Sequence, residues 1–262
     1  EATVYVLMEI RQETDYVLHH AQKILAIFAA MRDFAQQLGR MGHRVHYLRI
    51  DDSDNRQSLP ANLDTLIDRY CASAFEYQAP DEWRLDRQLA DYGKQRNITV
   101  RMVDSEHFYT QRDEAARLFS GRKQWLMEHF YRQMRIRHSV LMSEAGKPLG
   151  GQWNFDHDNR KPWPGIPREP ADWRIAHDHS TLWHNIQQAG VASFGEANAA
   201  RFYWPLNRTE ALQQLDAFMD QGLPYFGEFQ DALSHRGWRL FHSLLSFALN
   251  TKMLHPREVV AQ

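Results

Sequence analysis

The stretch TVYVLMEI, residues 3–10, decides the fold class. An apolar run of this kind is typical of a strand that is covered on both faces. Apolar residues at helical spacing follow over residues 21–38, and Gly39 is positioned to cap that helix. A second strand is predicted over residues 43–50, HRVHYLRI. Strand, helix and strand in this order predict parallel pairing through a right-handed crossover.

The same alternation continues along the chain. It predicts helices over residues 59–72 and 81–96, the second with an acidic cap in DEWR, and strands over 75–78 and 98–103. We therefore expect an α/β fold with a Rossmann-like parallel sheet. Ligands of such sheets bind at the carboxyl ends of the strands. Those ends are residues 9–13, 51–55, 80–83 and 104–108.

Strand patterns stop near residue 110. A basic, aromatic helix is predicted over residues 121–137, and the irregular segment GGQWNFDHDNRKPWPG occupies 150–165. Three further helices are predicted, over residues 181–189, 209–221 and 241–252. The expected organisation is an α/β domain over 1–120, a basic helix and long linker over 121–169, and the start of an all-helical domain over 170–262.

Composition limits the function classes. The 262 residues are 43% apolar and carry a net charge of −2, so any contact with nucleic acid must come from a local patch. The single cysteine, Cys71, excludes a disulfide framework and a cysteine-ligated metal site within these residues. It is typical of a reducing compartment, and we expect a cytoplasmic protein. No apolar run reaches the ~20 residues of a membrane-spanning helix, so we expect no membrane partner.

The two ends lie inside predicted elements, a strand at the start and a helix at the end. We therefore expect the chain to be a piece of a longer protein.

Several local patterns leave two interpretations open. DDSDN, residues 51–55, has the start of a calcium loop but lacks the Gly and Glu that such a loop places sixth and twelfth, which favours a solvated loop. The histidines of HDHSTLWH could bind a transition metal or lie at a surface helix cap: His177, His179 and His184. DYVLHH, residues 15–20, opens a helix and could hold a polar ligand, or it could be a plain cap with two solvent-facing histidines.

The helix over residues 121–137 also has two interpretations. Basic and aromatic side chains alternate along it, either for nucleic acid or for packing against a neighbour: Arg122, Lys123, Arg132, Arg135 and Arg137 with Trp125, Phe130 and Tyr131. The sequence contains no GxGxxG, Walker, GxSxG or HExxH motif. The common nucleotide-binding and hydrolase fingerprints are therefore absent.

GGQWNFDHDNRKPWP, residues 150–164, resembles the GG-x-WNFD-x-ENR-x-P signature of the bacterial photolyase-related proteins. This family contains the iron–sulfur (6-4) photolyases and their cryptochrome relatives. Residues 13–38 and 121–135 resemble the family's first helix and the helix before the signature. LPYFGEFQDAL followed by LFHSLLSFALNTKMLHPREV resembles the entry into its flavin domain. The resemblance covers nearly the whole chain.

The resemblance implies an α/β antenna domain followed by a helical domain that binds FAD. It also implies a 6,7-dimethyl-8-ribityllumazine antenna, and a [4Fe–4S] cluster held by four cysteines in the C-terminal half, beyond Gln262. The family usually begins with a strand ending in GDQL, and this chain starts after it. The implied partner is UV-damaged DNA, and we expect a monomer.

The resemblance also assigns site residues. Glu13, Tyr16 and Ile27 match positions around the lumazine, where a carboxylate would bind ring or ribityl donors and the other two would sandwich the ring. Glu9 and Trp83 are weaker candidates for the same site. The helical spacing of Ile27 also agrees with a plain core residue.

In the helical part, the FAD pyrophosphate would be held by HSLLS, through Ser243, Leu244 and Ser246, unless these simply cap or face solvent. Asp231 matches an acidic residue near the lesion, or is a surface aspartate. The irregular segment is expected to face DNA through Asp156, Arg160 and Lys161. Trp153, Asn154 and Phe155 would pin it down. Alternatively, the whole segment only staples the two domains together.

The resemblance thus implies light-driven repair by a (6-4) photolyase-type lyase, in which an electron passes from reduced FAD to a UV photoproduct. It also implies that most of the flavin pocket lies beyond Gln262, so we do not expect these residues alone to repair DNA. A cryptochrome-like photoreceptor without repair activity is the alternative. A third hypothesis is a nucleotide-binding α/β module that binds no chromophore.

Overall fold

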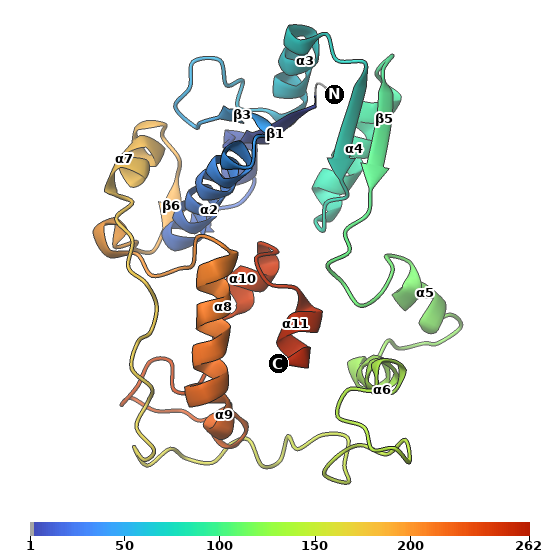
Figure 1. The fold of residues 1–262 in the computed structure, drawn as a ribbon, viewed down its shortest axis with the longest axis vertical. Coiled ribbons are helices and arrows are strands. Elements are labelled where there is room, and N and C mark those ends of the chain that lie inside the picture. The colour runs from blue at the N-terminus through green and yellow to red at the C-terminus, as the bar shows by residue number, and fades with distance from the viewer. Residues whose placement is uncertain (1–2) are drawn as a thin grey trace. The chain divides into compact units, whose positions relative to one another are not determined.

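The computed structural model describes residues 3–262 and divides into two compact units (Figure 1). The first contains the residues up to 105 together with 174–207, and the second contains 106–173 and 208–262. Residues 174–207 therefore pack with the α/β part of the chain. The functional domains expected at 1–120, 121–169 and 170–262 remain a prediction.

The predicted strands of the first unit pair in parallel. β1 (Val4–Met8) pairs with β3 (Arg44–Leu48), and β4 (Ala74–Gln78) pairs with β5 (Thr99–Val103). Each pair is joined by its own crossover helix, α2 (Ala21–Arg40) or α4 (Trp83–Lys94). In the described part of the chain the two pairs stay separate, whereas the sequence predicted one sheet. Each crossover helix brings its own two strands together, but no strand of one pair is hydrogen-bonded to a strand of the other pair.

The two strand pairs are connected by apolar side chains rather than by backbone hydrogen bonds. Leu63, Leu89 and Tyr92 form a buried cluster, and Met8 of β1 and Phe75 of β4 pack against it. Leu63 belongs to α3 (Leu59–Tyr70), and the other two belong to α4. The hydrophobic core therefore fixes the two pairs within one unit.

The helix ends differ from prediction in small ways. α2 continues through Gly39 to Arg40. It begins after His20, whose Nδ1 accepts from the Gln22 N–H. α4 is capped by Glu82, whose carboxylate accepts from the N–H groups of Arg84 and Leu85, both at 2.9 Å. Short elements that the sequence did not predict complete the unit: α1 (Arg11–Asp15), and β2 (His19–His20) paired with β6 (Ser193–Phe194). α7 (Ser180–Gln188) and the 3-10 turn η1 (Ala199–Arg201) lie in the later segment.

The second unit is helical among its described residues. Its elements are α5 (Glu114–Leu118), α6 (Met127–His138), α8 (Arg208–Ala217), the π-helical turn η2 (Phe218–Gly222), α9 (Leu223–Phe229), α10 (Ser246–Asn250) and α11 (Pro256–Ala261). The predicted helix 241–252 is wrong over its first part, because Leu244 has a φ of 56° and breaks the helix. Helix α6 also begins at Met127, later than the predicted residue 121.

Two apolar clusters support this unit. Ala211, Leu215 and Phe218 pack with Leu245 and Ala248, which joins α8 and η2 to α10. Trp163, Phe229, Leu240 and Phe241 form the other cluster, so the irregular segment is anchored on α9 by a buried indole. In the described part of the chain, no helix combines the length and the apolar character needed to cross a membrane.

Candidate functional site

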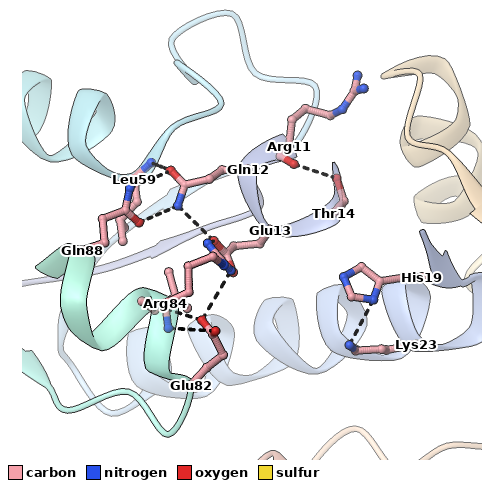
Figure 2. Close-up of polar contacts among 11 residues, drawn as sticks. Arg11, Gln12, Glu13, Thr14, His19, Lys23, Leu59, Glu82, Arg84 and Gln88 are labelled. Carbon is pink, nitrogen blue, oxygen red and sulfur yellow. Dashed lines mark hydrogen bonds and ion pairs between the residues drawn. The ribbon is translucent and has the colours of Figure 1, made fainter. Parts of the chain in front are cut away.

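An ion pair at the strand ends brings two distant segments together (Figure 2). Glu13 lies in α1, just after β1, and Arg84 lies in the first turn of α4, just after β4. The Arg84 guanidinium donates to both Glu13 oxygens, at 3.1 and 2.7 Å. The hydrogen bond to Glu13 raises the pKa of Arg84. This pairing agrees with the expectation that ligand-facing side chains gather at the carboxyl ends of parallel strands.

Gln12 ties the same corner to two helices. Its amide donates to Gln88 of α4 at 2.7 Å and to Glu13 at 3.0 Å, and its oxygen accepts from the Leu59 N–H of α3 at 3.0 Å. α1 is therefore held in place by α3 and α4 together, although it has only five residues of its own. The Glu13 carboxylate is consequently held in place by Gln12 and Arg84.

Tyr16 lies beside the ion pair, and we refer to Glu13, Tyr16 and Arg84 together as the strand-end site. The Arg84 guanidinium lies over its ring at 4.2 Å, and the His19 ring meets its edge at 5.0 Å. Tyr16 nevertheless stays 51% exposed, so part of the ring is available to a ligand. His19 is buried and lies 3.1 Å from the Lys23 ammonium. Burial, with the Lys23 charge, lowers the pKa of His19.

Two further candidates of the α/β part, Ile27 and Trp83, lie on α2 and at the start of α4. Ile27 is half-buried on α2, beside a face formed by Ile24 and Phe28, which agrees with either a core or a ligand-facing role. Trp83 is 73% exposed, and the Arg87 guanidinium covers its ring at 5.3 Å.

Glu9 is fully buried and braces the strand end. Its carboxylate accepts from Arg32 at 2.6 and 2.9 Å, from the Tyr47 hydroxyl at 2.7 Å and from the Ile50 N–H at 2.9 Å. Burial, with the Glu9 charge, raises the pKa of Tyr47. Because all of its contacts are made inside the chain, Glu9 holds β1, β3 and α2 together.

HSLLS, the candidate FAD segment, forms a turn before α10. Leu244 is left-handed, with a φ of 56°, and Leu245 follows at φ −79° and ψ −7°. Residues of alternating hand turn successive backbone N–H groups toward one side, and such concavities bind anions. Ser243 is half-buried and Ser246 is exposed. Within the turn, the Leu245 N–H already donates to the Ser243 hydroxyl at 3.4 Å.

Gln214 of α8 binds the backbone of the HSLLS turn. This side chain is 3% exposed, and its amide donates to the carbonyl oxygens of Ser243 at 3.0 Å and Leu244 at 2.8 Å. Because both carbonyls point to Gln214 of α8, the N–H groups of the same two peptide units, those of Leu244 and Leu245, point away from it. The second of them donates to the Ser243 hydroxyl.

The irregular segment is paired to α9 and the residues just after it. The Lys161 ammonium lies 2.6 Å from Glu228, and the backbone of Lys161 also donates to the Glu228 carbonyl. Arg160 lies 3.5 Å from Asp231, whose N–H donates to the Asn159 carbonyl. The pKa of Lys161 is raised by the hydrogen bond to Glu228. Asp156, the third DNA-facing candidate, is exposed.

Upstream of these pairs, aromatic residues attach the segment to α6. The guanidinium groups of Arg132 and Arg135 lie 5.3 and 5.4 Å from the Trp153 ring. Arg135 is 6% exposed and donates to the Val140 and Leu141 carbonyls. Arg132 also pairs with Glu128 of the same helix, so both arginines near Trp153 already have partners within the chain.

The other sequence patterns have structural roles. Asn55 of DDSDN is buried and donates to the Glu9 and Arg49 carbonyls. The His177 and His179 rings stack at 5.7 Å before α7. Over residues 3–262, no group of three or more His, Cys, Asp or Glu side chains could hold a metal ion. A four-cysteine cluster does not fit this chain either, because its single cysteine is the exposed Cys71.

Sequence reasoning missed Arg84, Gln12, Gln88 and Gln214. Only Arg84 carried a signal, because it follows the acidic cap at a strand end within DEWR. The glutamines act through contacts between segments far apart in the sequence, which spacing alone does not reveal.

Comparison with known proteins identifies the family. The family model "deoxyribodipyrimidine photo-lyase-related protein" matches residues 1–202. A (6-4) photolyase of Agrobacterium fabrum is 36% identical over 256 residues, which cover 97% of this chain and 50% of that protein. The chain thus spans about half the length of this relative.

Two further similarities are weaker. A β-cyclopiazonate dehydrogenase of Aspergillus oryzae is 26% identical over 113 residues, or 43% of this chain and 22% of that enzyme. The crystal structure of a bacterial class III photolyase from Agrobacterium tumefaciens aligns with a TM-score of 0.49 and 19% identity, covering 98% of this chain and 45% of that one.

Proposed function

Because this chain belongs to the deoxyribodipyrimidine photo-lyase-related protein family, we propose that it takes part in light-driven repair of UV-damaged DNA, as a lyase of the (6-4) photolyase type. The observation that carries the proposal is the 36% identity to a (6-4) photolyase across 97% of the chain. Reduced FAD would supply the electron for reversing the photoproduct, and a lumazine antenna would collect light.

The strand-end site is the proposed antenna site. The Glu13 carboxylate, held by Arg84, would accept hydrogen bonds from ring or ribityl donors, while the exposed Tyr16 and the half-buried Ile27 would offer apolar contact to a flat ring. Trp83 lies at the rim. Glu9 supports this site from within the core. An unpaired buried donor, Arg84 Nε, agrees with a ligand that carries an acceptor.

The proposed flavin contact is the HSLLS turn. The backbone N–H groups around Leu244 and the hydroxyls of Ser243 and Ser246 would hold the pyrophosphate, with Gln214 keeping the turn in shape. The [4Fe–4S] cluster of the family would require cysteines outside these residues.

The proposed DNA contact is the irregular segment. Arg160 and Lys161 would meet phosphates from the same DNA-facing loop as Asp156, and Asp231 would lie on the lesion side. Flipping the damaged bases out of the duplex would be part of the cycle.

The test is photoreversal. Protein supplied with FAD and lumazine would be mixed with an oligonucleotide that carries one (6-4) photoproduct, reduced, and either illuminated with blue light or kept dark. We expect chromatography to show the intact dinucleotide only after illumination, and no reversal of a cyclobutane dimer in a parallel oligonucleotide. Light-driven flavin reduction without reversal of either lesion would contradict repair and favour the cryptochrome-like alternative.

A further inference from the structure

Arg84 contains a donor that the chain itself does not satisfy. Its Nε is buried, and within residues 3–262 it has no hydrogen-bond partner. The two terminal nitrogens are occupied by Glu13, and one of them also lies 3.5 Å from Glu82. Buried polar groups are almost always paired, since an unpaired one costs about 1–3 kcal/mol. The missing acceptor is therefore to be sought outside the protein chain.

The surroundings restrict what that acceptor can belong to. Arg84 stands between the Glu13 carboxylate and the partly exposed Tyr16 ring, which its guanidinium overlies at 4.2 Å. An aromatic surface beside an in-plane N–H donor suits a flat heterocycle with an acceptor on its edge. The edge carbonyls of a pyrimidinedione, which lumazines and flavins share, have this chemistry.

We propose that Arg84 contacts the ligand of the strand-end site directly, with Nε–H donating to an edge carbonyl of a bound pyrimidinedione ring. Glu13 then has two roles: it binds ligand donors and it orients the guanidinium. This inference rests on the proposed antenna site, which assigned ligand contacts to Glu13 and Tyr16 but none to Arg84.

The proposed ligand contact requires an arginine at position 84, and another cationic side chain could not replace it. A guanidinium is a rigid plane with five donors, so it can bind a carboxylate with its terminal nitrogens and still present Nε–H at a fixed angle. A lysine at this position would keep the charge and could pair with Glu13, but it has no second donor in the plane. Arg84→Lys therefore separates the ion pair from the ligand contact.

The experiment is a titration of the full chain with 6,7-dimethyl-8-ribityllumazine, followed by fluorescence anisotropy, and in parallel with FAD. The variants are Arg84→Lys and Arg84→Met. Arg96→Met is the matched control, because Arg96 likewise pairs with a carboxylate, that of Asp64, and covers a tyrosine ring, that of Tyr92. Thermal unfolding without ligand reports any structural damage.

We expect both Arg84 variants to lose about tenfold or more in lumazine affinity, as expected for a lost hydrogen bond from a charged donor. Arg96→Met should bind like the wild type, and Arg84→Lys should unfold within a few degrees of the wild type. Wild-type affinity in Arg84→Lys would overturn the Nε contact while leaving the antenna site intact. If the wild type binds FAD instead of lumazine, and Arg84→Lys lowers the affinity for FAD, then Arg84 Nε donates to the flavin ring rather than to a lumazine ring. If the wild type binds neither ring, the antenna proposal fails and this inference fails with it.

Discussion

Glu9 and Glu13 stand at the same strand end but have different environments. Glu9 is fully buried, and its carboxylate is satisfied by Arg32, Tyr47 and the Ile50 backbone. Glu13 and its partner Arg84 keep about a third of their side-chain surface in solvent, at 30% and 34%. The Glu9–Arg32 pair is buried and therefore has a structural role, whereas the Glu13–Arg84 pair is accessible to a ligand.

Replacing each glutamate separates these roles. Glu9→Ala leaves the Arg32 charge without its partner and should cost about 3 kcal/mol or more of the free energy of unfolding. Glu13→Ala breaks a partly exposed pair and should cost about 1 kcal/mol or less. Urea unfolding measures both. Equal losses would contradict the distinction.

His19 should make stability depend on pH. Its folded-state pKa is lowered by burial and by the Lys23 charge, against an opposing contribution from Glu13. The unfolded chain therefore binds the proton more readily, so the stabilisation is present above about pH 6.5 and is lost as the pH falls. We expect the unfolding midpoint of the wild type to fall more steeply from pH 7 to pH 5 than that of His19→Gln. Parallel profiles would show that His19 does not contribute.

At the scale of elements, the irregular segment depends on contacts rather than on regular hydrogen bonding. Trp153 is stacked under two arginines of α6, Trp163 is buried against α9, and Phe155 touches Gly150. A Cβ at Gly150 would lie 2.8 Å from the Phe155 ring, whereas a Cβ at Gly151 would meet nothing within 4 Å. Both glycines have a φ of +80°.

This pair of glycines gives a matched test of the Phe155 contact. Alanine at either position adopts a left-handed conformation at a cost of about 1 kcal/mol or more. Only Gly150→Ala must also displace Phe155, so we expect it to lower the free energy of unfolding further and to speed protease cleavage within residues 150–165. If Gly151→Ala has the same effect, the Phe155 contact does not hold the segment.

Periodicity predicted the local elements well and their connections less well. The strands and crossover helices of the α/β part follow from alternating apolar runs, and both strand pairs are parallel as expected. The helix over 241–252 failed because Leu244 is left-handed, and leucine gives no sign of that conformation in a sequence. At the candidate antenna site, the resemblance pointed to Glu13 and Tyr16, and their contact with a ligand stays a prediction. Arg84 did not, because its contact with Glu13 joins segments 71 residues apart.

At the scale of the whole molecule, a net charge of −2 does not attract DNA by itself. Binding must come from local cations, and in the irregular segment these are already paired: Lys161 with Glu228 and Arg160 with Asp231. A phosphate would have to replace a carboxylate at each position. DNA binding by this segment, as proposed, would therefore compete with the ion pairs that hold it on α9 and the residues just after it.

Charge substitutions test this competition. Lys161→Gln should weaken binding to UV-irradiated duplex DNA and reduce the slope of log affinity against log salt by about 0.9, the value for one phosphate contact. Glu228→Gln should strengthen binding, because it releases the lysine. Lys94→Gln, which breaks an exposed pair with Asp91 in the other unit, is the control. Fluorescence anisotropy at several salt concentrations measures all three. If Lys161→Gln and Lys94→Gln behave alike, the segment does not contact phosphate.

Whether this chain is a light-driven protein is tested most directly by identifying the chromophores that it binds. Protein from cells that make both cofactors would be purified and its absorption and fluorescence spectra recorded. The supernatant after heat denaturation would then be separated by chromatography. A light-driven protein of this family should release 6,7-dimethyl-8-ribityllumazine, which the strand-end site would hold, together with FAD held by the HSLLS turn. A colourless protein that also fails to bind either compound when it is added would contradict the account.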